Sequence, residues 1–290
     1  MNQTGKKIKG LEVMVAETIH EANDTVTLVL FTGNDHLTYE PGHFLTIEPQ
    51  QFSALKRWVS YLEDIKGRKE RPRAYSLSSS PDEKYLAITV KEERYISGVT
   101  PYPPLLSPIL AKRTESGTRM VITGFTGPYT LTEKIRAESD EIVHICAGSG
   151  IVPTYSIIKH DLRVNNKMKH TLVYSNKRLE DVIFLRQLGE LQKDFPDRLG
   201  VIHTLTRETD ESLFNTNVLK GRVTADLLKQ FILAPERTMV FTCGPDHSVW
   251  QKKAAAEKRE TLKPSFLGSV LSYLQELGIP KNRIKKESYG

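Results

Sequence analysis

Residues 71–80 combine the side chains that a flavin dinucleotide needs. The stretch reads RPRAYSLSSS. Arg73 is a fixed cation whose planar fork of donors suits phosphate. Positions two apart in a strand point to the same face, so Tyr75 shares a surface with Arg73, and Ser76 adds a hydroxyl beside them. The stretch predicts a flavin seat, although a basic strand followed by a serine-rich turn gives the same pattern.

A second group of residues follows the apolar run 141–146. Here Ala147-Gly-Ser-Gly150 joins a predicted strand to a helix expected at 153–163. Glycines let the backbone approach a pyrophosphate, and a helix N-terminus carries partial positive charge toward it. The turn opens an α/β half of the chain, which favours a dinucleotide site over a merely tight turn.

Three further groups end predicted strands of that half. Cys243-Gly244-Pro245 follows 238–243, at the strand end where open α/β sheets bind ligands. Alone, a free cysteine is more often a small buried hydrophobe. Two other strand ends offer a cationic set for the adenosine end of a dinucleotide: Ser175, Lys177, Arg178, Thr206 and Arg207. These cations favour NADPH over NADH, although exposed loop cations are common.

The first half of the chain must place Arg73 on a strand. Short β-branched runs with turn signals between them predict an antiparallel barrel over about the first 130 residues, with strands at 11–17, 25–31, 44–47, 85–91 and 118–123. A charged excursion at 51–72 interrupts it, with Trp58, Val59, Tyr61 and Leu62 as an apolar anchor. A proline-rich loop at 99–108 leads into a helix expected at 108–114, with Ser107 as N-cap and Pro108 at its first position.

Strands and helices alternate after about residue 135, which implies a parallel sheet with helices on both faces. We expect strands at 141–146, 170–175, 199–205, 238–243 and 283–287, and helical segments at 153–163, 180–192, 224–232 and 247–278. The predicted fold is a two-domain β + α/β protein. Residues 1–135 form an antiparallel β-barrel domain and residues 136–290 a parallel-sheet α/β domain.

Composition excludes several classes of protein. Cys146 and Cys243 are the two cysteines, too few for a disulfide framework or for the four thiolates of a typical iron–sulfur cluster. No apolar run reaches membrane-spanning length and no secretory signal opens the chain, so we expect a cytoplasmic protein that binds no membrane. The charge of +6 is spread out, which excludes nucleic acid and suits an acidic partner or an anionic cofactor.

We find no metal-ligand spacing and no Ser/His/Asp set, and His144 is expected to be a core residue. The sequence leaves the oligomeric state open.

Landmarks along residues 10–290 resemble those of the ferredoxin–NADP reductase superfamily. Arg73-x-Tyr75-Ser76 is similar to its flavin motif. The other landmarks follow along the chain in the order that the superfamily has them. They are Ser107-x-x-Leu110, Gly124–Tyr129, Ala147–Pro153, Tyr174-x-Asn176 with Asp181 and Phe184, Cys243-Gly-Pro, and Glu287-x-Tyr289. The chain departs from the pattern at Val152, where many members have threonine, and in an insertion at 251–266.

The resemblance implies FAD and NADPH (or NADH) as cofactors, and roles for single residues. Arg73 would hold the flavin phosphates, Tyr75 would pack on the isoalloxazine ring, and Ser76 would approach its N5 atom. The expected catalytic residues are Ser76, Cys243, Glu287 and Tyr289. The expected cofactor-binding residues are Arg73, Ala74, Tyr75, Ser76, Thr89, Val90, Lys91, Leu106, Ser107, Gly148, Ser149, Gly150, Pro153, Ser175, Asn176, Lys177, Arg178, Thr206, Arg207, Cys243, Gly244 and Pro245.

The favoured function is a flavin-dependent oxidoreductase that takes hydride from NAD(P)H and passes electrons to a separate acidic carrier protein or an oxygenase component. The basic excursion 51–72 and the basic insertion 251–263 are candidate docking surfaces. One alternative is a free-flavin or small-molecule reductase without a protein acceptor. The other is a non-enzymatic flavin- or nucleotide-binding regulatory subunit.

Overall fold

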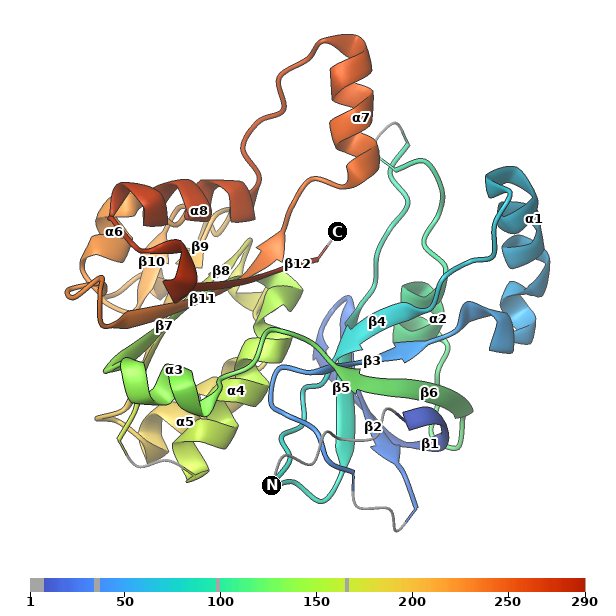
Figure 1. Cartoon of the computed structure of the whole chain (residues 1–290), viewed down its shortest axis with the longest axis horizontal. Coiled ribbons are helices and arrows are strands. Elements are labelled where there is room, and N and C mark those ends of the chain that lie inside the picture. The colour runs from blue at the N-terminus through green and yellow to red at the C-terminus, as the bar shows by residue number, and fades with distance from the viewer. Residues whose placement is uncertain (1–7, 34–36, 98–99, 165–166, 290) are drawn as a thin grey trace. The chain divides into compact units, whose positions relative to one another are not determined.

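The computed structural model describes residues 8–33, 37–97, 100–164 and 167–289. The chain divides into two compact units, Met1–Thr130 and Leu131–Gly290 (Figure 1).

The first unit is built on a six-stranded antiparallel sheet in the order β4-β3-β6-β1-β2-β5. A bridge between Leu77, just after β4, and Ile88 of β5 connects the two edge strands and closes the sheet. The predicted antiparallel barrel is therefore confirmed. Its strands are β1 (Ile8–Ala22), β2 (Thr25–Phe31), β3 (Phe44–Ile47), β4 (Arg73–Ser76), β5 (Leu86–Lys91) and β6 (Arg119–Thr126).

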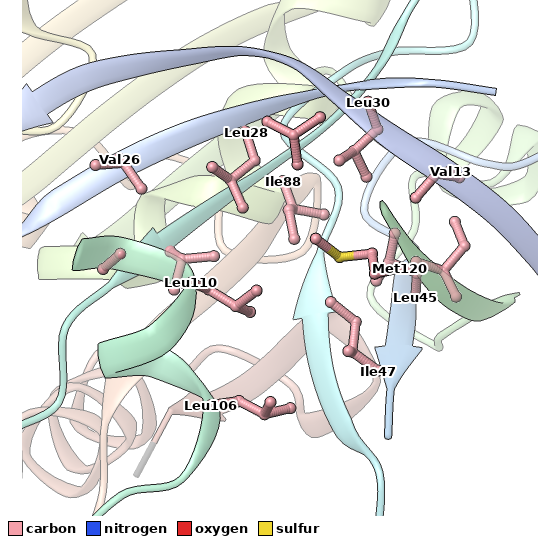
Figure 2. Close-up of a cluster of buried hydrophobic side chains, with 14 of the residues drawn as sticks. Val13, Val26, Leu28, Leu30, Leu45, Ile47, Ile88, Leu106, Leu110 and Met120 are labelled. Atoms are coloured by element: carbon pink, nitrogen blue, oxygen red, sulfur yellow. The ribbon is translucent and has the colours of Figure 1, made fainter. Parts of the chain in front are cut away.

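The barrel core is made of aliphatic side chains from these strands and from helix α2 (Leu106–Lys112). Leu106 and Leu110 lie four positions apart, on one face of α2, and both are fully buried. Figure 2 shows them together with Val26, Leu28 and Ile88 of the sheet. The helix thus covers the barrel with an apolar stripe.

Helix α2 begins two residues before its predicted start. Leu105 occupies the N-cap position and makes no side-chain capping bond, so the assignment of Ser107 as N-cap was wrong. The Ser107 hydroxyl instead accepts a hydrogen bond from the backbone N–H of Glu93, at 3.1 Å. Burial of Leu106 fixes the helix start more strongly than the serine–proline signal does.

The excursion 51–72 is largely helical. The 3₁₀ turn η1 (Pro49–Gln51) leads into it. The excursion contains the 3₁₀ turn η2 (Ser53–Leu55) and helix α1 (Lys56–Lys66), which stands off the barrel beyond β3 and β4 (Figure 1). Val59 and Leu62 are buried as predicted. Tyr61 was wrongly assigned to the anchor, because half of its surface (50%) is exposed.

The second unit is a six-stranded sheet in the order β10-β9-β8-β7-β11-β12, with every neighbouring pair parallel. This confirms the predicted α/β domain. Its strands are β7 (Glu141–Ala147), β8 (Lys169–Asn176), β9 (Leu199–Leu205), β10 (Val218–Lys220), β11 (Thr238–Pro245) and β12 (Ile284–Tyr289). Strand β10, with three residues, was not predicted.

Helices cover both faces of this sheet. Ile158 and Leu188 belong to the core cluster under α4 (Ile151–Val164) and α5 (Leu185–Asp194), whereas Leu228 and Val270 belong to the cluster under α6 (Ala225–Lys229) and α8 (Phe266–Glu276). The remaining elements are α3 (Glu133–Glu138), α7 (Val249–Lys258), η3 (Gly148–Gly150), η4 (Leu179–Asp181), η5 (Glu211–Leu213) and η6 (Lys281–Arg283).

The helical segment expected at 247–278 is two helices rather than one. Arg259 ends α7 in the left-handed conformation (φ 54°), and α8 begins after Ser265, whose hydroxyl accepts from the Gly268 N–H. Helix α7 therefore projects from the end of β11 on its own (Figure 1).

A chain of buried polar side chains ties α3, α4, β8 and β7 together. Arg136 donates to Asp161 at 2.8 Å, and Asp161 is hydrogen bonded to His170 at 2.9 Å. His170 is in turn 3.0 Å from His144, which is fully buried against the Phe241 ring. The core assignment of His144 is confirmed.

Candidate functional site

Strand β4 presents Arg73 and Tyr75 on one face. Arg73 is opposite Ile47 of β3, and Tyr75 is opposite Leu45. Residues directly opposite in an antiparallel pair lie on the same face, and both β3 residues are fully buried in the barrel core. The shared surface that the sequence predicts for Arg73 and Tyr75 is therefore present.

Tyr75 and Ser76 offer different chemistry. The Tyr75 ring packs partly buried against the core, and burial raises the pKa of its phenol, so it remains a neutral donor. Ser76 is opposite Phe44, on the other face, and is 5% exposed. The Tyr75 ring therefore shares its surface with Arg73, whereas the Ser76 side chain expected beside them lies on the opposite face of the strand.

The guanidinium group of Arg73 keeps donors for a ligand. It donates one hydrogen bond to the Glu70 carboxylate at 2.7 Å and another to the backbone carbonyl of Arg71. An arginine has five N–H donors, so three have no partner among the residues that the structure describes. Its side chain is 38% exposed, which suits a phosphate partner.

The other predicted flavin-binding residues have side chains committed elsewhere. Thr89 shares a hydrogen bond with Thr27 at 2.7 Å, and Lys91 pairs with Asp24 at 3.3 Å. Val90 and Leu106 belong to the barrel core, and Ala74 is exposed. Any part that these residues take in cofactor binding would come from their backbones.

The glycine turn of the second unit lies at the switch point of the sheet. From β7 the chain runs outward through β8 to β10 and then returns to β11 on the other side of β7. Open α/β sheets bind ligands where the strand order reverses in this way, beyond the carboxyl ends. Gly148–Gly150 follows β7 and Cys243–Pro245 ends β11, so the two predicted motifs meet at this point.

Close packing explains the glycines. Gly148 adopts φ +53°, a left-handed conformation that favours glycine. A Cβ on Gly150 would lie 2.2 Å from the carbonyl oxygen of Cys243, and one on Gly244 would lie 2.5 Å from the Phe266 ring. Pro153, in the first turn of α4, is buried, whereas Ser149 is half-buried.

Cys243 and Glu287 are neighbours on one face of the sheet. They are register partners on β11 and β12, and Cys146 of β7 is the partner of Cys243 on its other side. Burial raises the pKa of the Cys243 thiol well above its usual value, so the thiol stays protonated. Burial also raises the pKa of Glu287 to about 7, and one of its carboxylate oxygens has no hydrogen-bond partner among the described residues.

The predicted adenosine-binding loops lie side by side. Thr206 donates its backbone N–H to the Asn176 carbonyl at 3.0 Å, and Arg207 donates to the Lys177 carbonyl at 2.8 Å. The Asn176 side chain is buried beneath these loops. Ser175 is 8% exposed and lies on β8 just before Asn176.

The cations of these loops are not equivalent. Arg178 pairs with Glu180 at 3.5 Å, whereas Lys177 and Arg207 are exposed and make no ion pair within the described part of the chain. At the other edge of the sheet, Tyr289 is the register partner of Pro245 and is half-buried.

Two roles were missed from the sequence, that of Tyr174, which was named only as part of a landmark, and that of Glu70. The Tyr174 hydroxyl donates to the Gly148 carbonyl at 2.9 Å and accepts from the Ile183 N–H at 3.3 Å, so it fixes the glycine turn. Glu70 holds Arg73. Its position four residues after Lys66 is an ion-pair spacing that could have drawn attention to it.

Residues 144–249 match the oxidoreductase NAD-binding domain family. The whole chain superimposes on the ferredoxin–NADP⁺ reductase of Plasmodium falciparum with a TM-score of 0.66 and 17% identity, covering 99% of this chain and 100% of that one. The chain therefore shares the fold of this reductase. The fold is also similar to that of the flavohem-like FAD/NAD-binding domain of the Vibrio cholerae nitric oxide dioxygenase, with a TM-score of 0.69, 21% identity, and coverage of 97% of this chain and 99% of that one.

Two curated relatives align with this chain by sequence. Flavohemoprotein A of Dictyostelium discoideum is 26% identical over 96% of the chain, and NADH-cytochrome b5 reductase 2-B of Vanderwaltozyma polyspora is 33% identical over 56%. The alignments span 60% and 52% of the lengths of those proteins. Among the described residues, no helix combines the length and apolar character needed to span a membrane.

Proposed function

We propose that the chain is an FAD-dependent NAD(P)H oxidoreductase that passes electrons to a separate protein acceptor. The observation that supports this most is the glycine turn at the β7–β11 switch point, where Gly150 packs on Cys243 in the domain that matches the NAD-binding family. Glycines in this position let a dinucleotide pyrophosphate reach the backbone.

FAD would be held by the barrel unit. Arg73 would bind its phosphates through the three donors left by Glu70 and Arg71. Tyr75 would pack on the flavin ring, and Ser76 would hydrogen bond at its edge. Bound FAD supplies the redox chemistry, since it accepts an electron pair as hydride and can release single electrons, while the chain supplies orientation and electrostatics.

The nicotinamide nucleotide would lie along the carboxyl edge of the second sheet. Gly148, Ser149 and Pro153 would line it, and the neutral Cys243 thiol would lie beside the reacting ring together with Glu287. A glutamate with a pKa of about 7 can hold or release a proton near neutral pH. We therefore propose that Glu287 controls the charge next to the nicotinamide.

We propose a preference for NADPH over NADH. Lys177 and Arg207 are brought together by the hydrogen bond between their backbones and carry no ion pair within the described residues. Two exposed cations at the adenosine end suit a 2′-phosphate. Arg178 contributes less, because Glu180 neutralises it.

The acceptor would be an acidic carrier protein or an oxygenase component. Helix α1 exposes Tyr61 and Ile65, each 50% exposed, on the same helical stripe as Arg57. The exposed Arg68 and Lys69 follow the helix. An apolar centre with a basic rim suits an acidic protein surface. Lys66 does not belong to this rim, since it is paired with Glu70.

Anaerobic stopped-flow mixing with NADPH and with NADH, followed through flavin absorbance, tests the proposal. Loss of the oxidised flavin spectrum within a catalytic turnover time, faster with NADPH, is expected. A purified protein that binds no FAD, or whose FAD is not reduced by either nucleotide, would contradict it. Saturable oxidation by an acidic carrier, compared with a small-molecule acceptor, separates a protein-directed reductase from a free-flavin reductase.

A further inference from the structure

The charged excursion 51–72 is joined to strand β4 at one buried carboxylate, that of Glu70. Its side chain is only 2% exposed. Lys66 of α1 donates to one oxygen, and Arg73 of β4 donates to the other at 2.7 Å. The Lys66 ammonium group also lies 4.8 Å from the ring centre of Tyr102, in the proline-rich loop. Glu70 therefore links α1 to β4, and the proline-rich loop contacts this cluster through Lys66.

The backbone of Glu70 is fixed as firmly as its side chain. Its N–H donates to the Glu63 carboxylate at 2.9 Å, and its carbonyl accepts from the Gln50 amide at 2.9 Å. The same amide donates to Glu63 at 3.0 Å. A carboxylate held by this many bonds has little freedom to follow a moving arginine, so it acts as a fixed point for Arg73.

Glu70 is charged despite its burial. Desolvation opposes ionisation, but the hydrogen bonds from Lys66 and Arg73 prevail and lower the pKa of the carboxyl below its ordinary value. With two cations around one anion, the cluster Lys66–Glu70–Arg73 keeps a net positive charge. It can still attract phosphate while the Arg73 fork is held in one orientation.

We propose that Glu70 is a positioning residue that orients the Arg73 guanidinium group toward a phosphate of FAD. The inference rests on the proposed function, because it presumes that Arg73 meets a flavin phosphate. Glu70 contacts Arg73 and not the cofactor, so its effect must depend both on Arg73 and on the phosphate.

Binding of FAD and of riboflavin to flavin-free protein, measured by fluorescence titration, provides the test. Riboflavin carries the same ring without phosphate. Glu70→Gln should weaken FAD binding about tenfold, the order expected for a lost charged hydrogen bond, and leave riboflavin binding unchanged. Asp64→Asn is the matched control: it removes the same charge from an exposed position of α1 and should change neither affinity.

A double-mutant cycle with Arg73→Met makes the dependence on Arg73 explicit. In the Arg73→Met protein, adding Glu70→Gln should cause no further loss of FAD affinity. Glu70→Asp keeps the charge on a shorter arm, and it should show the same FAD-selective loss if the glutamine variant does not fold. Equal losses for FAD and riboflavin, an additive cycle, or tighter FAD binding by Glu70→Gln would overturn the positioning role. Wild-type protein that binds no FAD would contradict the proposed function instead.

Discussion

Gly150 packs so closely on Cys243 that a Cβ at residue 150 would lie 2.2 Å from the cysteine carbonyl oxygen. The obstacle is backbone of β11, which cannot rotate away as a side chain can. The contact holds the glycine turn against the end of the neighbouring strand. It thereby sets the spacing between the two motifs that converge at the switch point.

Gly150→Ala should destabilise the protein by about 1–3 kcal/mol, the usual cost of overpacking, and should weaken nicotinamide nucleotide binding. Urea denaturation and nucleotide titration measure the two effects. Gly189→Ala is the control: Gly189 is in helix α5 with nothing within 4 Å of its added Cβ. It should be neutral or stabilising by up to about 1 kcal/mol. Equal stability of the two variants would refute the close-packing argument.

Arg73 and Ser76 should separate binding from catalysis. Arg73→Ala should lose FAD, because the phosphate cation is gone, and Ser76→Ala should retain FAD but slow flavin reduction at saturating NADPH. Flavin content after purification and stopped-flow reduction distinguish the two outcomes. A Ser76→Ala protein that is reduced at the wild-type rate would show that the hydroxyl has another role.

Arg207 should discriminate between the nucleotides. Arg207→Gln should lower kcat/KM for NADPH about tenfold, the order of a lost charged contact, and leave NADH little changed. Arg178→Gln is the comparison, with a smaller effect because Glu180 already pairs with this arginine. If Arg207→Gln affects both nucleotides equally, Arg207 does not contact a 2′-phosphate.

Neutralising Arg57, Arg68 and Lys69 together should lower kcat/KM for an acidic carrier several-fold at low ionic strength. It should also flatten the salt dependence, because long-range attraction is screened by salt. Reduction of ferricyanide, a small acceptor, should be unchanged. The corresponding triple variant of α7, Lys252, Lys253 and Lys258 to Gln, tests the other basic insertion, and a loss confined to it would place docking there.

Because of Glu287, the free energy of unfolding should fall as pH rises. Burial raises its pKa from the ordinary 4.5 to about 7 in the folded protein. The folded state thus holds a proton that the unfolded chain releases, and this contribution is complete below pH 4.5 and is lost as pH rises through 7. Glu287→Gln should reduce the loss of unfolding free energy between pH 5 and about 8, measured by urea denaturation. Glu276→Gln, at an exposed position ending α8, should leave that loss intact.

The sequence predicted the architecture well because most elements carry a local signal. The β-branched runs gave β2, β3, β5 and β9 nearly to the residue, and the switch from antiparallel to alternating strand–helix patterns separated the two folds. Strand β10 was missed because it has three residues and depends on pairing with β9. The break between α7 and α8 was signalled by Pro264 and Ser265, which a longer helical pattern obscured.

Residue types predicted which side chains could do chemistry, but not which of them already form ion pairs or hydrogen bonds within the protein. The sequence places Lys66 and Lys69 in one basic run, yet Lys66 is bonded to a buried carboxylate and Lys69 is exposed. Likewise Lys177 and Arg178 are adjacent, but only Arg178 has an acidic neighbour in ion-pair range among the described residues. Such differences depend on side chains brought together by folding, which spacing alone does not determine.

The single oxygen of the Tyr174 side chain joins two segments that the sequence keeps apart. It accepts a hydrogen bond from the Ile183 N–H and donates one to the Gly148 carbonyl. A nucleotide that moves the glycine turn must therefore disturb the phenol, and through it the chain entering α5. If a nucleotide binds this turn as proposed, we expect hydrogen exchange at the Ile183 amide, thirty-five positions after Gly148, to change on binding.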